Sequence, residues 1–200
     1  YGAGSGDIWV LKISDSGIFL WDKTYGSENL DLGNDICASN DNGYMIVGST
    51  HSKKTNSLDA YVIKIDSIGN IIWDQVYGGL LGDGLNSISK INDEYGYMLF
   101  GYTKSYMLDK SRKKKKGFLG RILSSVFKKE ASSESWLINI DEYGDRNWHT
   151  TYGGKKEDIG KQINSFSDNS FLLSNETESF GAGGKDIWLI KIDKNGKIIW

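Results

Sequence analysis

Hydrophobic and polar residues alternate along short stretches of this chain, with turn-forming residues between the stretches. Between residues 33 and 77 such stretches cover 35–39, 44–50, 60–65 and 70–77. Two of the separators, Asn40 to Gly43 and Asp66 to Gly69, have the composition of tight turns. Alternation with a period of two is typical of half-buried strands, so we expect four antiparallel β-strands here.

The same pattern returns along the chain. Asp7-Ile8-Trp9 recurs as Asp59-Ala60-Tyr61, Glu134-Ser135-Trp136 and Asp186-Ile187-Trp188, with steps of 52, 75 and 52 residues between the aromatic positions. The same steps separate a set of tryptophans, Trp21, Trp73, Trp148 and Trp200. A fixed period indicates one supersecondary unit copied along the chain. Four antiparallel strands in each unit are typical of a β-propeller blade.

The turn before each of these tryptophans has a simple physical basis. Asp66 can accept backbone amide hydrogen bonds, Gly69 can adopt a positive φ, and Trp73 can pack its ring between sheets. The copies are Asp141, Gly144 and Trp148, then Asp193, Gly196 and Trp200, and a weaker version with Ser14, Gly17 and Trp21. We therefore expect structural rather than catalytic carboxylates at these turns.

Residues 180–193, followed by Asn195, Gly196 and Trp200, and the segment Tyr77-Gly78-Gly79 resemble bacterial and archaeal β-propeller repeat proteins related to the kelch-like and PQQ-like groups. This resemblance implies an all-β fold, a partial β-propeller with about three and a half four-stranded antiparallel blades. The blade pieces are residues 1–25, 26–77, 78–152 and 153–200. We expect an incomplete propeller over residues 1–200 that is a fragment of a larger protein.

One connection breaks the period. Between the second and third strands, two copies have eight residues and the third has thirty, residues 104–133. Residues 110–129 of this basic insert carry a charge of +9, which leaves −11 for the rest of the chain. Its apolar residues are spaced by four, as on one face of a helix. The candidate contact residues are Arg112, Lys113, Lys114, Lys115, Lys116, Phe118, Ile122 and Val126.

Several interpretations of the basic insert stay open. It could be a solvated loop extension, partly helical or disordered, or it could dock on a partner or on the acidic body of the chain. A third interpretation is contact with an anionic membrane surface. The acidic remainder argues against nucleic acid as a ligand. No run of eighteen apolar residues occurs, so we expect no transmembrane segment.

Acidic residues also recur, before the third strands and after the Tyr-Gly pairs. They are Asp7, Asp59, Glu134 and Asp186 in the first set, and Asp31, Asp83 and Asp158 in the second. We expect them to accept hydrogen bonds at turns and strand starts. The alternative is an acidic ring on one face that attracts cations or the basic insert.

The sequence offers no catalytic, cofactor or metal site. Cys37, the single cysteine, excludes an intrachain disulfide and is expected to be a buried thiol, and His51 and His149 lie in or near turns. We expect a non-enzymatic binding or scaffold module with a protein or glycan partner, extracellular or on the cell surface by resemblance. The alternative is a fragment of a quinoprotein-like or hydrolase propeller enzyme whose active site lies in missing blades.

Overall fold

The chain folds into antiparallel β-sheets. The structure, a computed structural model, describes residues 2, 4–52, 56–92, 96–105 and 132–200. Its strands are β1 (Ile8–Ile13), β2 (Phe19–Tyr25), β3 (Asp31–Ala38), β4 (Tyr44–Ser52), β5 (Ser57–Ile65), β6 (Ile71–Tyr77), β7 (Asp83–Lys90), β8 (Gly96–Thr103), β9 (Glu134–Asp141), β10 (Arg146–Tyr152), β11 (Asp158–Ser165), β12 (Phe171–Thr177) and β13 (Asp186–Ile192). The described residues contain no helix, which confirms the all-β prediction. Accordingly, this part of the chain has no helix that could cross a membrane.

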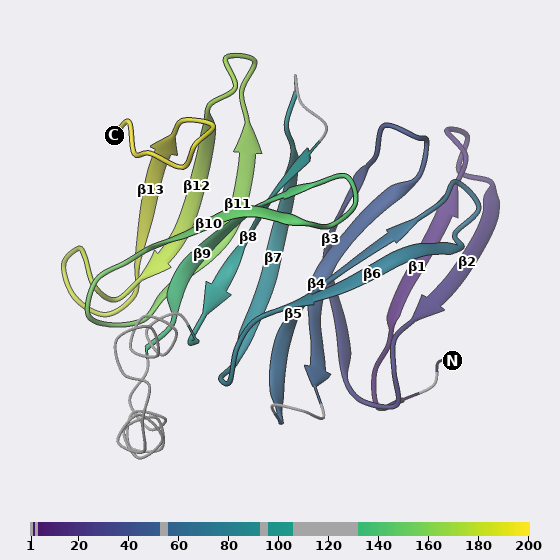
Figure 1. The fold of residues 1–200 in the computed structure, drawn as a ribbon, viewed down its shortest axis with the longest axis horizontal. Helices are drawn as coiled ribbons and strands as arrows, with labels where there is room; N and C mark the ends of the chain where they lie inside the picture. The colour runs from purple at the N-terminus through teal and green to yellow at the C-terminus, as the bar shows by residue number, and fades with distance from the viewer. Residues whose placement is uncertain (1, 3, 53–55, 93–95, 106–131) are drawn as a thin grey trace.

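Four blade-like sheets follow one another along the chain. Their strand orders are β1-β2, β3-β4-β5-β6, β7-β8-β9-β10 and β11-β12-β13, and all pairings are antiparallel. Figure 1 shows the sheets side by side in chain order, with the first and last sheets at opposite sides. The first strands β3, β7 and β11 contact one another in succession. Each sheet is therefore a local unit that packs on its neighbours in sequence.

The predicted turns hold the outer hairpins. Asp66 Oδ1 accepts the backbone amides of Ile68 at 3.0 Å and Asn70 at 2.8 Å. Asp141 and Asp193 accept the equivalent pairs of amides, all at 2.9 Å. These carboxylates are thus used as turn acceptors, as the sequence predicted.

The first strand of the second sheet begins earlier than the alternation predicted. β3 starts at Asp31 rather than at residue 35, and its pairing register shifts between Gly33 and Asp35. The bulged residue Asn34 donates from Nδ2 to the Leu85 carbonyl of the next sheet at 2.7 Å. An extra residue in one strand interrupts the period of two, which is why the pattern missed this segment.

Apolar side chains fill the space between neighbouring sheets. Ile8 and Tyr25 of the first sheet form one cluster with Ile46, Ile63 and Ile65 of the second. Two further clusters join the second sheet to the third and the third to the fourth. Alternate residues of one strand therefore face different neighbours, so a central sheet is covered on both sides.

A repeated polar contact, here called the Tyr–Gly joint, fixes the outer edges of these interfaces. The Tyr77 hydroxyl donates to the Gly144 carbonyl in the turn of the next sheet at 2.5 Å. The other joints are Tyr25 to Gly69 and Tyr152 to Gly196, both at 2.7 Å. At Gly144, φ is +87°, and a Cβ would lie 3.0 Å from the Trp73 ring. The turn thus needs glycine both for its backbone and for the approach of the ring.

Residues 106–131 lie outside the described residues. The predicted helical character of the basic insert, and all eight candidate contact residues within it, therefore stay predictions. The structure does describe the flanking residues Lys104, Ser105, Ser132 and Ser133.

The Tyr–Gly joint predicts the effect of Tyr77→Phe. This change removes a buried hydroxyl and leaves the Gly144 carbonyl without its donor, so it should lower the free energy of unfolding by about 1 kcal/mol. Denaturant unfolding measures the change, and Tyr143→Phe at an exposed turn position is the matched control. Equal stability of the two variants would contradict the importance of the joint.

The joints also predict alkaline unfolding. Burial, and then the charge of Asp66, raise the pKa of Tyr25 from 10.0 to about 12, and burial also raises the pKa values of Tyr77 and Tyr152. The folded state holds these protons more tightly than the unfolded state. Their contribution to stability is therefore complete below about pH 10 and lost as the pH rises through 12.

Tyrosinate absorbance during an alkaline titration measures this effect. The joint tyrosines should ionise only together with unfolding, well above pH 10. Ionisation of all eleven tyrosines in one step near pH 10, with the fold intact, would contradict it.

Candidate binding site

The acids that follow the Tyr-Gly pairs, Asp31, Asp83 and Asp158, are the first residues of strands β3, β7 and β11. They help to hold the sheets together and are not part of the candidate site. Asp83 is fully buried, and its Oδ2 accepts the Gly79 amide and the Ser105 hydroxyl, both at 2.8 Å. Its Oδ1 accepts the Thr103 hydroxyl at 2.5 Å and the Lys104 amide at 3.2 Å. Burial raises the pKa of Asp83, although these hydrogen bonds oppose the shift. The carboxyl group ties the inter-sheet connection to the end of β8.

Asp158 repeats this arrangement in the last sheet. Its Oδ2 accepts the Gly154 amide at 2.8 Å and the Ser179 hydroxyl at 2.7 Å, and its Oδ1 accepts the Thr177 hydroxyl. Asp31 accepts the Ser27 amide at 2.6 Å in the second sheet. These contacts agree with the expected strand-start role. In the described part of the chain, no group of three or more His, Cys, Asp or Glu side chains is placed to hold a metal ion.

A cleft of about 540 Å³ opens where the second, third and fourth sheets meet. It lies at the end of β8 and the beginning of β9, the point from which the basic insert leaves the sheet. We call it the Tyr102 cleft. Its lining residues are Leu58, Gly82, Asn86, Tyr102, Lys104, Ser133, Glu157, Ile159 and Lys161.

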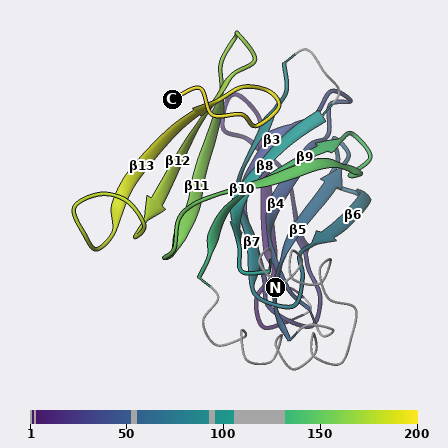
Figure 2. The same cartoon turned by 60° about the vertical axis from the view of Figure 1, so that its left-hand side comes forward.

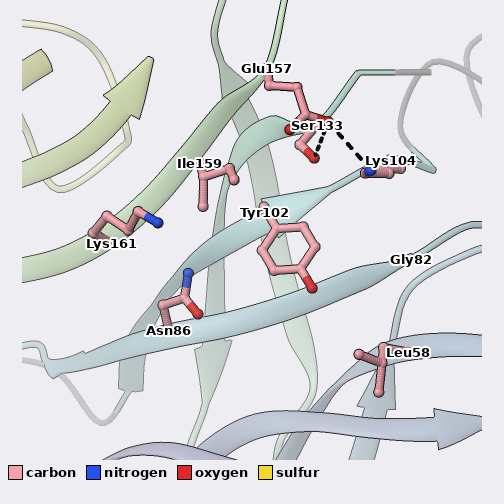
Figure 3. A pocket seen from close by; sticks show the side chains of 9 residues that line it. All are labelled: Leu58, Gly82, Asn86, Tyr102, Lys104, Ser133, Glu157, Ile159 and Lys161. Carbon is pink, nitrogen blue, oxygen red and sulfur yellow. Dashed lines mark hydrogen bonds and ion pairs between the residues drawn. The ribbon is translucent and has the colours of Figure 1, made fainter. Parts of the chain in front are cut away.

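Charged groups stand at both ends of the Tyr102 cleft. Figure 3 shows Glu157, Ser133 and Lys104 together at one end, and Lys161 toward the other. Glu157 Oε1 lies 3.4 Å from Lys104 Nζ and 3.5 Å from Ser133 Oγ. Lys161 Nζ lies 3.3 Å from Glu176 Oε2. Both lysines are partly exposed, so a ligand can reach their ammonium groups.

Tyr102 lies in the middle of the lining, beside Asn86 (Figure 3). Its ring packs on Gly84, where a Cβ would lie 2.8 Å from the ring. Burial, and then the nearby Asp83, raise the pKa of Tyr102, so the hydroxyl stays protonated at neutral pH. Asn86 is held in place because its Nδ2 donates to the Gly160 carbonyl at 2.7 Å. The cleft thus presents a fixed aromatic ring among polar groups.

Tyr102 and Lys161 occupy positions at which the copies of the repeat differ. Where the third sheet has Tyr102, the pairing registers place Ser49 in the second sheet and Glu176 in the fourth. Lys161 replaces the asparagines Asn34 and Asn86. Sequence reasoning missed these residues because it looked for catalytic groups. A comparison of the copies could have revealed them, because the residues at these equivalent positions differ from one copy to the next.

The structure brings the base of the basic insert to the cleft. Lys104 and Ser133, the first and last residues of the insert, both line it. The candidate residues from Arg112 to Val126 lie outside the described residues. The basic insert of residues 104–133 therefore begins and ends at residues that line the Tyr102 cleft.

The Cys37 thiol and the His149 imidazole are of types that often act in catalysis, but here both take part in packing or hydrogen bonds between strands. Burial, and then the charge of Asp35, raise the pKa of the Cys37 thiol from 9.0 to about 12, so the thiol is protonated at neutral pH. His149 Nδ1 accepts the indole N–H of Trp136 at 2.9 Å. Neither group faces the Tyr102 cleft.

Comparisons with protein-family models and with the sequences of known proteins find no match to this chain.

The buried carboxylates predict the effect of Asp83→Ala. This change leaves the Gly79 amide and the Thr103 hydroxyl without their acceptor and should lower the free energy of unfolding by about 2 kcal/mol. Thermal or denaturant unfolding measures the loss, and Asp15→Ala at an exposed turn is the control. A variant as stable as the parent chain would show that Asp83 is not a framework residue.

Proposed function

We propose that this chain is part of a β-propeller that acts as a non-enzymatic binding module and holds a glycan in the Tyr102 cleft. The propeller assignment is supported by the succession of blade-like sheets and by the contacts among their first strands. The relation to kelch-like and PQQ-like propellers rests on the sequence motifs. Location outside the cell or on its surface is an expectation from the same resemblance.

One observation carries the binding proposal. The contacts between sheets recur in every copy, such as the hydroxyl groups of Tyr25, Tyr77 and Tyr152 donating to turn glycines. At the Tyr102 cleft, by contrast, Tyr102 and Lys161 are residues that the other copies lack at the equivalent positions. Packing between the sheets does not require different residues at these positions in each copy. A ligand site does require particular groups at one place.

The chemistry of the lining favours a glycan. A protonated tyrosine offers an apolar ring face and a hydroxyl group, and both suit a sugar ring with its hydroxyls. Lys104 and Lys161 can donate hydrogen bonds, and Glu157 can accept them. Each lysine already has a glutamate within 3.4 Å, which reduces the net charge of the lining and disfavours a ligand bound through charge alone.

The absence of catalysis is proposed on chemical grounds. A Cys nucleophile would need to ionise, but burial raises the pKa of Cys37 to about 12. The Nδ1 atom of His149 is occupied by the Trp136 indole. The charged groups of the cleft form separate ion pairs, Lys104 with Glu157 and Lys161 with Glu176, and do not surround one reacting atom.

A glycan array followed by calorimetric titration of the best oligosaccharide tests the proposal. Tyr102→Ala removes the central ring and should weaken binding about tenfold or more, since truncation of such a side chain in a binding site commonly costs over 1 kcal/mol. Lys161→Ala should weaken binding less. Lys197→Ala, an exposed lysine in the last hairpin, should leave binding unchanged.

Two results would overturn the proposal. One is that no glycan on the array binds. The other is that a glycan binds equally well to the parent chain and to Tyr102→Ala while both remain folded by circular dichroism.

A further inference from the structure

The Tyr102 cleft lies between two equivalent rows of residues, one in the third sheet and one in the fourth. Each row consists of every second residue around the start of a first strand, β7 or β11. The third-sheet row is Gly82, Gly84 and Asn86, and the fourth-sheet row is Glu157, Ile159 and Lys161. All of these residues except Gly84 line the cleft. Figure 2 shows β11 on the side of the fourth sheet next to the third sheet, where it contacts β7 and β8, so the two rows lie on either side of the cleft.

The third-sheet row leaves room for a ligand. Apart from the chain neighbours of Gly82, the nearest described atom to a Cβ on this residue would be the Leu58 carbonyl oxygen, at 4.0 Å. At Gly84 a Cβ would lie 2.8 Å from the Tyr102 ring, so glycine allows the ring to lie against the strand. A larger side chain at either position would occupy part of the cleft or displace the ring. The two glycines therefore keep the space beside Tyr102 open.

The fourth-sheet row presents three different groups to the cleft. Glu157 supplies a hydrogen-bond acceptor, Ile159 an apolar surface and Lys161 a donor. Figure 3 shows Ile159 between the two charged residues of this row. In the second sheet the equivalent positions hold Leu30, Leu32 and Asn34. Among the described rows, the combination of acceptor, apolar surface and donor therefore belongs to the fourth sheet.

Packing of the sheets does not account for Ile159. Its side chain is partly exposed and is not a member of the three apolar clusters in the described part of the chain. Its counterpart in the third-sheet row is Gly84, so the repeat does not need an apolar side chain at this position. An apolar side chain that lies among polar groups in a cleft, and that the core does not use, is suited to an apolar group of a ligand.

A secondary amide that carries a methyl group matches the fourth-sheet row. The N–H and C=O groups of a trans amide point in opposite directions, so their partners must lie on opposite sides of it. Glu157 and Lys161 lie on opposite sides of Ile159, where the carboxylate can accept from the N–H and the ammonium group can donate to the C=O. Their ion pairs leave capacity for this, because an ammonium group has three donors and a carboxylate has two acceptor oxygens. A sugar hydroxyl could use either charged residue but would offer no apolar group to Ile159.

We propose that the glycan held in the Tyr102 cleft carries an acetamido group, which the fourth-sheet row recognises. The sugar ring lies on Tyr102, and the methyl group lies over Ile159 with the amide between Glu157 and Lys161. This inference rests on the proposed glycan-binding function and names the class of sugar. The three residues of the row then determine specificity.

Matched pairs of sugars test this proposal by calorimetric titration. One pair is the tetramers of N-acetylglucosamine and of glucose with the same linkage, and the other is the corresponding oligosaccharides of N-acetylgalactosamine and of galactose. The members of a pair differ only in an acetamido or a hydroxyl group on one carbon of each sugar. In at least one pair the acetamido member should bind at least about tenfold more tightly, since the hydroxyl member leaves Ile159 and one of its polar neighbours without a partner group.

Variants of the fourth-sheet row assign this preference to its residues. Ile159→Ala should weaken binding of the preferred acetamido sugar about tenfold. Ile72→Ala, at a 53% exposed position of β6 outside the lining, is the matched control and should leave binding unchanged. Glu157→Ala should also weaken binding, whereas Glu157→Gln keeps an acceptor oxygen and should retain most of the affinity. Circular dichroism checks that each variant is folded.

Three results would overturn this inference and leave the proposed function intact. The hydroxyl members of both pairs could bind as tightly as the acetamido members, or a glycan without an acetamido group could bind more tightly than both acetamido probes. The third result is an unchanged preference in the folded Ile159→Ala and Glu157→Ala variants. Binding of no glycan at all, on the array or in the titrations, would overturn the inference together with the proposed function.

Discussion

The contact between neighbouring sheets is the constraint on which the rest of this structure depends. Strand pairing is confined to each sheet, so the array relies on side-chain packing and on polar contacts across each gap. The Tyr–Gly joint meets this need at the outer edge by placing a hydroxyl group and a tryptophan ring on the turn of the next sheet. At the inner edge, bulged asparagines such as Asn34 reach the backbone of the following sheet.

This constraint also separates the framework from the candidate site. Residues at the joints, the turns and the strand starts must recur, since each interface needs the same contacts. Residues near the end of β8 face a gap that the sheets do not close. Packing therefore does not require the same residue at these positions in every copy of the repeat. Tyr102 and Lys161 are two such residues, and the framework carboxyl of Asp83 lies near enough to Tyr102 to raise its pKa.

Much of the fold could be predicted from the sequence because its rules are local. The spacing of Asp66, Gly69 and Trp73 describes a turn whose hydrogen bonds span four residues. The starts of the first strands were missed because a bulge after Gly33 interrupts the alternation. The Tyr102 cleft could not be predicted in the same way, since it joins residues from β5, β7, β8 and β11 that no short pattern relates. The helical face expected in the basic insert lies outside the described residues and stays a prediction.

Because three sheets contribute to the Tyr102 cleft, the proposed binding would depend on how these sheets pack. Leu58 comes from the second sheet, Tyr102 from the third and Ile159 from the fourth, so a ligand that touches all three stabilises both of the interfaces between them. A change that loosens the Tyr77–Gly144 or the Tyr152–Gly196 joint would then also weaken the proposed site, because these joints hold the two interfaces that the cleft spans. Substitutions within the cleft need not have the reverse effect, because Lys104 and Lys161 contribute little to the apolar clusters that hold the sheets together. Residues that line the cleft can therefore be substituted without loss of the contacts that hold the fold.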